Sequence, residues 1–285
     1  MTRRVGLLGK PLRRRHSKVM HDAAFRAAGI DATYDLLELD ADAVAAAVDA
    51  ARGPGWLGLG VTAPYKKLVA ELVDEVEPEA TRIGAVNNVT KDEAGRLIGF
   101  NSDAPGFRAG VELAMGRPLA GTTVVVAGAG GAAHAVVYAC LSAGARSVTI
   151  GNRTVASAAA LAERFADVGE GSVRGVGLDD PAFAAALAQA DVAVNATTVG
   201  MVDPGATIPV EVLRDDVIVF DLVYVPPETP LLAAARARGL RAANGSEMLI
   251  AQAAIAFERW TGIGGMDGVM REAVAPLLVD PTAIA

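Results

Sequence analysis

Two residues in the first half of the chain could move a proton to and from a small substrate. Lys66 follows the segment Val61–Tyr65, and Asp103 follows Gly99–Ser102. A lysine ammonium can protonate a ketone oxygen when hydride reaches the carbonyl carbon, and the neutral amine can take the proton back in reverse. A neighbouring aspartate would position the amine and stabilise its charged form. The pair is typical of reversible ketone reduction, with Lys66 as the acid–base residue and Asp103 as its partner.

Each of these residues also has a structural interpretation. Lys66 could be a solvated residue that begins a helix beside Lys67, and Asp103 could cap the helix that follows it. Spacing alone leaves both interpretations open, because lysines and aspartates are common at helix starts for reasons unrelated to catalysis.

A glycine-rich turn in the second half predicts a dinucleotide site. The apolar segment Thr123–Ala127 runs into a turn in which Gly128, Gly130 and Ala133 satisfy the pattern G-x-G-x-x-[GA]. The first glycine allows a tight turn, the second lets the main chain approach a pyrophosphate, and the helix that follows supplies N–H donors. A glycine-rich corner without a ligand is the alternative. The residues of the turn expected at the cofactor are Gly128, Ala129, Gly130, Gly131 and Ala132.

The residues after the next strand indicate which dinucleotide is bound. NAD sites usually place Asp or Glu about 20 residues beyond the glycine turn, where it binds the ribose 2′-hydroxyl. Here the segment Ile150–Thr154 contains no acid but includes Arg153. A guanidinium can pair with a 2′-phosphate, which a carboxylate would repel. The prediction is NADP, and it is compatible with Thr154 capping the next helix.

Strand-like and helix-like segments alternate along the chain, which predicts βαβ units and a mainly parallel sheet. We predict an α/β fold with two domains, joined near Ala104–Gly121. The first is an N-terminal α/β substrate domain, residues 1–105, on which the C-terminal helices 246–285 pack back. The second is an NADP-binding Rossmann domain, residues 106–245. The first-half strands are predicted at Val5–Leu8, Tyr34–Leu39, Leu57–Val61, Val86–Thr90 and Leu97–Phe100, and its helices at Met20–Gly29, Ala41–Ala51 and Lys66–Val73.

Composition excludes several classes of protein. The chain of 285 residues has 26 Lys and Arg against 33 Asp and Glu, a net charge of −7, which disfavours nucleic acids and anionic membranes as partners. One cysteine excludes an internal disulfide, and three histidines make a histidine-built metal site improbable, so no metal is expected. No apolar run suits a signal peptide or a membrane span. We expect a soluble cytoplasmic protein, with a homodimer as the candidate assembly.

Nine short motifs occur along the chain in a characteristic order: GKP at Gly9–Pro11, VTAPYK at Val61–Lys66, IGAVNN at Ile83–Asn88, GFNSD at Gly99–Asp103, GAGGAAHA at Gly128–Ala135, GNRT at Gly151–Thr154, NATTVGM at Asn195–Met201, DLVY at Asp221–Tyr224 and GSEMLIAQAAIAF from Gly245. Together they resemble the shikimate dehydrogenase family over nearly the whole length. No single motif is diagnostic, whereas their order and spacing are specific.

The resemblance implies NADP-linked interconversion of 3-dehydroshikimate and shikimate, a pair of ring carboxylic acids. It assigns the acid–base role to Lys66 and the partner role to Asp103, which would also touch substrate hydroxyls. The substrate-binding residues that it implies are Ser17, Thr62, Asn87, Tyr224 and Gln252. The cofactor-binding residues that it adds are Asn152, Arg153 and Thr154 at the adenosine phosphate, and Thr198, Val199, Gly200, Leu222 and Gly245 along the nicotinamide.

The chain departs from the family pattern before its first helix. The family has His-Ser-x-Ser-Pro, whose two hydroxyls hold the substrate carboxylate, whereas Arg15-His16-Ser17 offers one serine. Counted from Gly9, Ser17 takes the second serine position and Arg15 the first; matching His16-Ser17 instead requires an insertion and a deletion. Arg15 could pair with the carboxylate or belong to a solvated basic loop. Gly60 stands where the family commonly has Asn.

These departures leave the ring acid open. Quinate, an aminoshikimate or another hydroxylated ring acid is the alternative substrate on the same fold. A regulator that binds NADP without turnover is the alternative of a different class, and the presence of both Lys66 and Asp103 argues against it.

Overall fold

The chain forms two compact units in a computed structural model that describes residues 2–12 and 14–279. Unit 1 comprises the residues up to Ser102 together with those from Ile250 onward, and unit 2 is Asp103–Leu249. Residues 1 and 280–285, which belong to the predicted substrate domain, lie outside the described residues. Each unit is built around one six-stranded sheet, so the predicted α/β class is confirmed.

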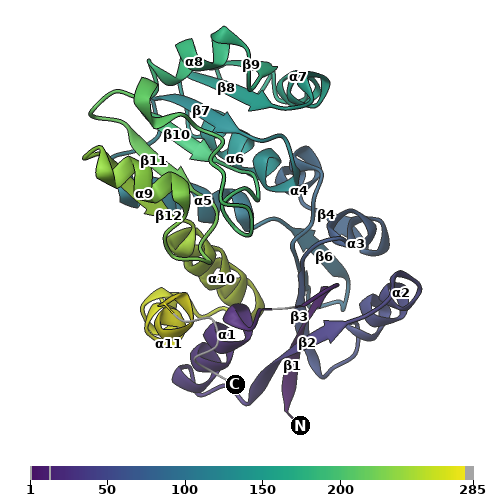
Figure 1. Ribbon diagram of the computed structural model, residues 1–285. Coiled ribbons are helices and arrows are strands. Elements are labelled where there is room, and N and C mark those ends of the chain that lie inside the picture. The colour runs from purple at the N-terminus through teal and green to yellow at the C-terminus, as the bar shows by residue number, and fades with distance from the viewer. Residues whose placement is uncertain (1, 13, 280–285) are drawn as a thin grey trace. The chain divides into compact units, whose positions relative to one another are not determined.

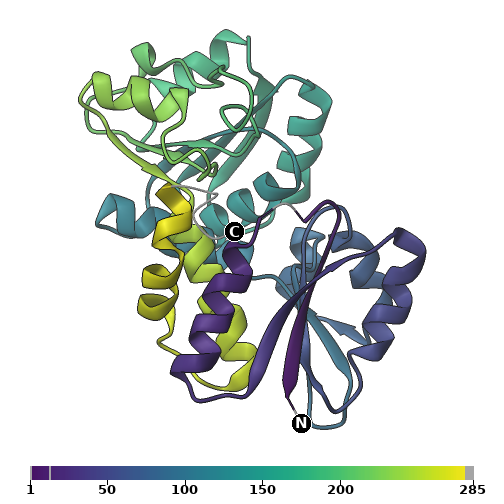
Figure 2. The ribbon, with the colours of Figure 1, turned by 60° about the horizontal axis from the view of Figure 1, so that its bottom comes forward.

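The sheet of unit 1 is mixed, with the order β2-β1-β3-β5-β6-β4. Neighbours run parallel except that β5 is antiparallel to both β3 and β6. Helices α1 and α11 lie on one side of the sheet, and α2 and α3 on the other (Figures 1 and 2). The strands are β1 (Arg3–Gly9), β2 (Ala32–Glu38), β3 (Trp56–Val61), β4 (Glu75–Val76), β5 (Asn88–Lys91) and β6 (Leu97–Phe100), and the helices α1 (His16–Ala27), α2 (Ala41–Ala50), α3 (Lys66–Leu72), α4 (Pro78–Ile83) and α11 (Asp267–Val279), with α10 (Ser246–Thr261) continuing from unit 2.

The reversed strand β5 brings polar residues to one edge of this sheet. The strand predicted at Val86–Thr90 begins later, at Asn88, because the main-chain nitrogens of Val86 and Asn87 donate to Lys66 O and Phe100 O. The register pairs Asn88 with Gly60 of β3 and with Phe100 of β6. Because β5 is antiparallel, its amino end lies beside the carboxyl ends of β3 and β6.

An aromatic cluster around a buried histidine fills the side of the sheet that faces α1. The ring of His21 stacks on Tyr34 of β2 with centroids 4.5 Å apart, and lies 5.1 Å from Trp260 and 6.4 Å from Phe257. His21 is 2% exposed, and its Nδ1 has no hydrogen-bond partner among the described residues. Burial therefore lowers the pKa of His21 to about 3, since apolar surroundings disfavour the imidazolium.

The sheet of unit 2 is fully parallel, with the order β12-β11-β10-β7-β8-β9 of a doubly wound fold. The strand order reverses between β7 and β10, where such folds bind ligands. Helices α8 and α9 form a core with one face of the sheet, while α5 packs on α6 and Phe107 meets Phe220 edge-on. The elements are α5 (Asp103–Met115), β7 (Thr123–Ala127), α6 (Gly131–Ser142), β8 (Ser147–Asn152), α7 (Val155–Arg164), β9 (Ser172–Gly177), α8 (Pro181–Leu187), β10 (Val192–Asn195), the 3₁₀ turn η1 (Val210–Val212), β11 (Ile218–Asp221), α9 (Pro230–Ala237) and β12 (Arg241–Asn244).

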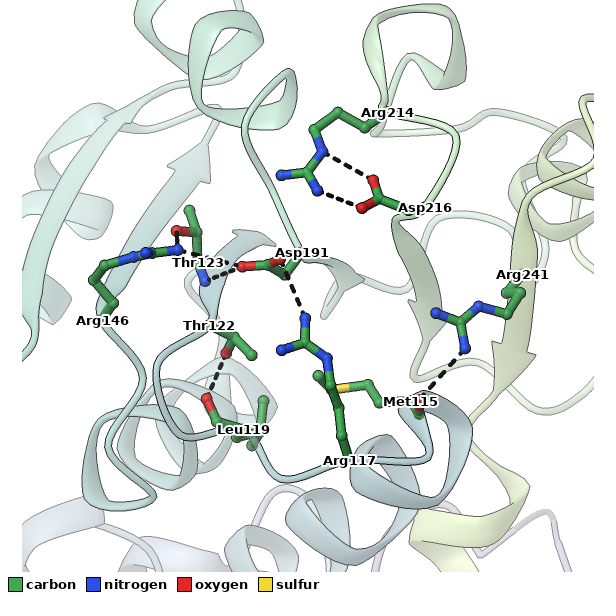
Figure 3. Close-up of polar contacts among 10 residues, drawn as sticks. All are labelled: Met115, Arg117, Leu119, Thr122, Thr123, Arg146, Asp191, Arg214, Asp216 and Arg241. Carbon is green, nitrogen blue, oxygen red and sulfur yellow. Dashed lines mark hydrogen bonds and ion pairs between the residues drawn. The ribbon is translucent and has the colours of Figure 1, made fainter.

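An ion-pair network ties the amino ends of these parallel strands together (Figure 3). The Asp191 carboxylate accepts from the Thr123 main-chain nitrogen at 2.8 Å and lies 3.2 Å from Arg117 and 3.6 Å from Arg146. The Asp191 side chain is only 15% exposed, so solvent screens these pairs less than ordinary surface pairs. The network secures the edge of the sheet opposite the glycine turn.

Strand β9 and the start of helix α1 differ from the sequence prediction. Strand β9 was not predicted because glycines interrupt its pattern, yet Gly175 is required there: a Cβ on it would lie 2.3 Å from the main chain of Ala158 in α7. The C-terminal helices predicted within 246–285 are present as α10 and α11, and α11 contains Pro276. Helix α1 begins at His16, earlier than the predicted Met20, which places Ser17 in its first turn, whereas Arg15 precedes the helix and is exposed. No helix within the described part of the chain is both long and apolar enough to cross a membrane.

We predict that replacing His21 with Leu makes unit 1 less sensitive to acid. Because folding lowers the His21 pKa from 6.5 to about 3, the unfolded chain binds a proton between these pH values that the folded chain does not. The stability that the neutral ring contributes is complete above pH 6.5 and is lost as the pH falls toward 3. His16, whose pKa burial also lowers, acts in the same direction and stays in the variant.

Urea unfolding followed by tryptophan fluorescence measures this effect, because both tryptophans, Trp56 and Trp260, belong to unit 1. Between about pH 7 and about pH 4 the wild type should lose roughly 1–3 kcal/mol more unfolding free energy than the variant. Equal losses in the two proteins would contradict the assignment of His21 as an acid-labile group.

Candidate active site

The polar segments of unit 1 are joined by main-chain hydrogen bonds. Val61 N donates to Asn87 O at 2.7 Å, and Val86 N donates to Lys66 O at 3.1 Å. Asn87 N in turn donates to Phe100 O at 3.2 Å. The loops after β3, before β5 and after β6 are thus held together at one edge of the sheet, with Lys66 at the start of α3 among them.

A buried side-chain network stands on this edge. Asn87 Nδ2 donates to Ser102 Oγ at 3.1 Å and to Gln252 Oε1 at 3.4 Å, while Asn87 Oδ1 accepts from Ser102 N at 2.8 Å and from Asn88 Nδ2 at 2.9 Å. Ser102 Oγ donates to Gln252 Oε1 at 3.3 Å. Two predicted substrate residues, Asn87 and Gln252, are therefore in direct contact although they lie 165 positions apart.

Sequence reasoning did not single out Ser102 or Asn88 as members of this network. Both lie in motifs quoted for the family resemblance, and the signal that could have found them is their burial: Ser102 is 0% and Asn88 4% exposed. Buried hydroxyl and amide groups need hydrogen-bond partners, which here are each other. They position Asn87 and Gln252 at the sheet edge.

The remaining predicted residues of the substrate site and the acid–base pair occupy the starts of helices or the ends of strands. Thr62 follows β3, and its main-chain nitrogen donates to Leu8 O at 2.8 Å. Asp103 is the first residue of α5 and belongs to unit 2, whereas Lys66 belongs to unit 1. Tyr224 belongs to unit 2 and follows β11.

The segment that departs from the family pattern is the start of α1. Arg15 is the exposed residue immediately before the helix, and Ser17 lies in the first turn. Ser17 is half-buried and lies one turn before the buried His21 on the same helix.

The glycine turn of unit 2 has two kinds of glycine. Gly128 has φ +113°, and a Cβ on it would lie 2.9 Å from Thr197 Cγ2 and 3.1 Å from the main chain of Ala196, so the fold itself requires glycine there. Gly130 has φ −83°, and a Cβ on Gly130 or Gly131 would meet no atom within 4 Å. The chain's own packing does not explain these two glycines.

Open space lies at the start of α6 instead. Gly130 is the residue before the helix, where main-chain N–H groups and the positive end of the helix dipole are suited to an anionic ligand. A pyrophosphate in that space would need the main chain to approach without a Cβ in between. The turn, which also includes Ala129 and Ala132, therefore fits the phosphates of a dinucleotide.

The segment after β8 presents the predicted 2′-phosphate residues. Asn152 Nδ2 donates to Thr154 O at 3.1 Å, which closes a tight turn around Arg153. Thr154 precedes α7, but its side chain makes no capping hydrogen bond. Arg153 and Thr154 are exposed, so the guanidinium and the hydroxyl can reach a ligand at the end of this strand.

A buried amide holds the segment that contains Thr198, Val199 and Gly200. Asn195, which is 1% exposed, donates from Nδ2 to Val199 O at 3.1 Å, and its Oδ1 accepts from Thr197 Oγ1 at 2.7 Å. The same Nδ2 donates to Asp221 Oδ1 at 2.9 Å. The end of β10 is thereby attached to the end of β11.

Asp221 is the buried last residue of β11, and groups from three segments donate hydrogen bonds to its carboxylate. Its carboxylate is 0% exposed and accepts from Thr229 Oγ1 at 2.7 Å, from Val223 N at 3.0 Å and from Asn195 Nδ2 at 2.9 Å. Burial raises the pKa of Asp221, while the hydrogen bonds from Thr229, Val223 and Asn195 act in the opposite direction. Neither Asn195 nor Asp221 was assigned a role from the sequence, although both lie in quoted motifs.

Leu222 and Gly245, two predicted nicotinamide residues, meet main chain to main chain. A Cβ on Gly245 would lie 2.3 Å from Leu222 O, so only glycine permits this approach. Leu222 N donates to Asn195 O at 3.0 Å, which connects the pair to the segment held by Asn195. The structure thus groups Leu222 and Gly245 with the Thr198–Gly200 segment in unit 2.

The described residues include no group of three or more His, Cys, Asp or Glu side chains that could hold a metal ion. The free thiol of Cys140 is 0% exposed, and burial raises its pKa, so the thiol is unreactive.

These features define a class: a two-unit α/β protein in which a Rossmann unit is shaped for a dinucleotide and a second α/β unit carries a polar edge for a small substrate. Three family models match the chain, the shikimate dehydrogenase substrate binding domain at residues 7–89, shikimate / quinate 5-dehydrogenase at residues 112–202, and the shikimate 5′-dehydrogenase C-terminal domain at residues 245–275. The chain belongs to the shikimate dehydrogenase family.

Relatives match over nearly their full length. The shikimate dehydrogenase (NADP(+)) of Methanopyrus kandleri is 40% identical over 273 residues, 95% of this chain and 94% of that protein. The shikimate 5-dehydrogenase of Thermus thermophilus, solved with NADP(H) and shikimate, superposes with a TM-score of 0.85 at 37% identity, covering 96% of this chain and 99% of that one. The quinate dehydrogenase of Corynebacterium glutamicum, solved with NAD, has a TM-score of 0.89 at 36% identity, covering 97% and 99%.

We predict that Gly130→Ala and Gly128→Ala separate cofactor binding from folding. A methyl group at position 130 enters open space, so thermal stability should change little while NADPH binding weakens about tenfold or more. A methyl group at position 128 meets Thr197 and Ala196 at a positive φ, so this variant should lose stability. NADPH fluorescence titration and thermal unfolding measure the two effects, and unweakened NADPH binding by Gly130→Ala would place the phosphates elsewhere.

Proposed function

We propose that this protein is an NADP-dependent oxidoreductase that interconverts 3-dehydroshikimate and shikimate. The observation that carries the proposal is the hydrogen-bonded edge of unit 1, where Asn87, Ser102 and Gln252 adjoin the segment that carries Lys66. The same chain also contains a glycine turn with space for a pyrophosphate. Relatives that are 40% identical to this chain are named shikimate dehydrogenase (NADP(+)).

Proton transfer is the role of Lys66 in this proposal. Bound NADPH supplies the hydride that reduces the ring ketone. The oxygen that gains negative charge takes a proton from Lys66 Nζ, and in the oxidative direction the neutral amine accepts the hydroxyl proton. Asp103 stabilises the ammonium form and accepts a hydrogen bond from a substrate hydroxyl.

Substrate recognition follows from the orientation of the amide groups in unit 1. Gln252 uses Oε1 to accept from Asn87 and Ser102, so its NH₂ group is the end that we assign to a substrate oxygen. Thr62 and Asn87 contribute further contacts to ring hydroxyls, and Ser17 binds the carboxylate. From unit 2, Tyr224 contacts the substrate.

Cofactor recognition is assigned to unit 2. The turn from Gly128 to Ala132 binds the pyrophosphate, and Asn152, Arg153 and Thr154 bind the 2′-phosphate of the adenosine. Thr198, Val199 and Gly200, together with Leu222 and Gly245, would hold the nicotinamide.

Turnover measurements with a panel of ring acids test the proposal. Shikimate, quinate and an aminoshikimate are each offered with NADP and with NAD, and the highest kcat/KM is expected for shikimate with NADP. Quinate is the second candidate substrate, supported by the single serine before α1 and by the similarity to a quinate dehydrogenase. A protein that binds NADPH but turns over no ring acid would be a regulator instead.

The homodimer and the cytoplasmic location stay predictions from the sequence.

We predict that Lys66→Met abolishes turnover while leaving NADPH binding unchanged. The substitution keeps the apolar stem but removes the group that exchanges the proton, so kcat should fall about 10²- to 10⁴-fold. Lys67→Met is the matched control, because Lys67 is the exposed neighbour on the same helix turn and should keep full activity. A Lys66→Met protein as active as this control would remove Lys66 from the mechanism.

We predict that Arg153→Ser weakens the enzyme's preference for NADP over NAD. A guanidinium that pairs with a phosphate contributes about 1.5–3 kcal/mol, so KM for NADP should rise roughly 10- to 100-fold. NAD lacks the 2′-phosphate and serves as the internal control, with a KM that changes about twofold at most. If both KM values rose equally, Arg153 would act on something other than the 2′-phosphate.

A further inference from the structure

Asp221 is a buried carboxylate to which the proposed mechanism gives no role. It is the last residue of β11 and is 0% exposed. Its Oδ1 accepts from Asn195 Nδ2 at 2.9 Å and from Val223 N at 3.0 Å, and its Oδ2 accepts from Thr229 Oγ1 at 2.7 Å. All three partners are donors, so the carboxylate acts as an acceptor at both of its oxygens.

The first partner, Asn195, helps to hold both main-chain groups of Val199. Asn195 Nδ2 donates to Val199 O at 3.1 Å, and Val199 N donates at 3.1 Å to Thr197 Oγ1, which itself donates to Asn195 Oδ1 at 2.7 Å. Because a carboxylate only accepts, Asp221 determines that the NH₂ end of the Asn195 amide points toward it. With the amide reversed, an oxygen would face both Asp221 and Val199 O, and the Val199 carbonyl would lose this donor.

The second partner, Thr229, lies against the next residue of the same segment. A Cβ on Gly200, whose φ is +92°, would lie 3.2 Å from Thr229 Cβ and 3.4 Å from Thr229 Cγ2. The Thr229 hydroxyl also accepts from Leu232 N at 3.3 Å as the residue before α9, so two hydrogen bonds fix its rotamer. Asp221 thus supports the segment at Val199 and at Gly200.

The third partner belongs to the other segment that would hold the nicotinamide. Val223 N donates back to Asp221 Oδ1, and Leu222 N donates to Asn195 O at 3.0 Å. The main chain after β11 is therefore held by the same two residues that hold Val199. Through these bonds one carboxylate fixes residues 198–200 and Leu222 relative to each other.

We propose that Asp221 is a positioning residue for hydride transfer: its carboxylate, acting through Asn195 and Thr229, holds residues 198–200 against Leu222 and thereby aligns the nicotinamide that they would hold. The inference rests on the proposed function and adds a residue to which the sequence analysis assigned no role. Hydride transfer needs the two carbons close together and aligned, and a misplacement of about 1 Å can lower kcat by about 100-fold. A buried acceptor with three donors aimed at it is a rigid support for such alignment.

Asp221→Asn tests the inference, with Asp191→Asn as the matched control. The first substitution keeps the shape of the side chain, but an NH₂ group replaces one acceptor oxygen, so the three donors can no longer all be accepted. The second makes the same chemical change in the same sheet at the opposite ends of the strands, where Asp191 accepts from Thr123 N and pairs with Arg117 (Figure 3). Both variants should therefore lose thermal stability.

Turnover should separate the two variants. In Asp221→Asn, kcat for 3-dehydroshikimate reduction should fall about 10- to 100-fold, because the nicotinamide is no longer aligned. The primary isotope effect with NADPH deuterated at the transferred position should rise, because hydride transfer becomes the slow step. Asp191→Asn should keep kcat within about twofold of the wild type and leave the isotope effect unchanged. Lower stability of Asp221→Asn without these changes, or equal changes in both variants, would overturn the inference, since a purely structural residue alters neither quantity in the folded enzyme.

Cofactor binding gives a readout that does not depend on turnover. Adenosine 2′,5′-bisphosphate carries the 2′-phosphate end of NADP but no nicotinamide. Asp221→Asn should raise Kd for NADPH about 5- to 20-fold and change Kd for the bisphosphate less than about twofold, while Asp191→Asn changes neither. Equal weakening of both ligands by Asp221→Asn would place its effect in the fold of unit 2 as a whole and would contradict a role at the nicotinamide.

Thr229 provides a second arm that remains decisive if Asp221→Asn fails to fold. Thr229→Val removes the hydroxyl that donates to Asp221 and keeps the shape of the side chain, so kcat should fall and the isotope effect should rise as in Asp221→Asn. Thr229→Ser keeps the hydroxyl and should retain kcat within about threefold of the wild type. Wild-type kcat in a folded Thr229→Val protein would show that the bond to Asp221 does not align the cofactor.

The wild type separates this inference from the proposed function. Turnover of a ring acid by the wild type, with unchanged kcat and isotope effect in Asp221→Asn, overturns only the role of Asp221. Absence of turnover with every ring acid overturns the proposed function and the role in hydride transfer with it. The Kd values for NADPH and the bisphosphate then still decide whether Asp221 acts at the nicotinamide.

Discussion

Buried amides at the ends of the strands must have hydrogen-bond partners, and the candidate site residues of each unit depend on this constraint. Asn87 in unit 1 and Asn195 in unit 2 are 5% and 1% exposed, and each bonds groups from segments far apart in the chain. An unpaired amide or carboxylate at these depths costs about 1–3 kcal/mol or more. These hydrogen bonds consequently hold the loops in one arrangement. That arrangement also determines where the exposed polar side chains of the same loops lie.

Glycines that leave room for another group are the second recurring feature of the fold. Gly128, Gly60 and Gly245 each lack a Cβ where another group lies, respectively Thr197, the Tyr34 hydroxyl and Leu222 O. Gly130 differs because nothing in the chain lies where its Cβ would be, which points to a ligand as the reason for glycine. Comparing what each absent Cβ would meet thus distinguishes glycines that packing requires from one that packing does not explain.

The ion pairs of Asp191 and the candidate cofactor-binding residues lie at opposite ends of the strands of unit 2. The amino ends of its strands are joined by Asp191 with Arg117 and Arg146, charged groups that fix the edge. The carboxyl ends carry the glycine turn, the Asn152–Thr154 turn and the segment held by Asn195. Parallel strands place all their carboxyl ends on one edge, so residues from several loops meet there without long insertions.

The α/β class, the doubly wound second half, the glycine turn and the start of α3 at Lys66 were determined by local pattern, because periodicity and turn chemistry act over a few residues. The motifs also singled out Asn87 and Gln252, which the structure brings into contact, and their role in substrate binding stays a prediction. The sequence by itself did not reveal β9, whose glycines obscure the strand pattern. Tertiary structure alone decided that β5 runs antiparallel, that Ser102 joins Asn87 to Gln252, and that the Tyr34 hydroxyl lies beside Gly60. Such contacts depend on strand order and side-chain reach across the sheet, which no local stretch of residues encodes.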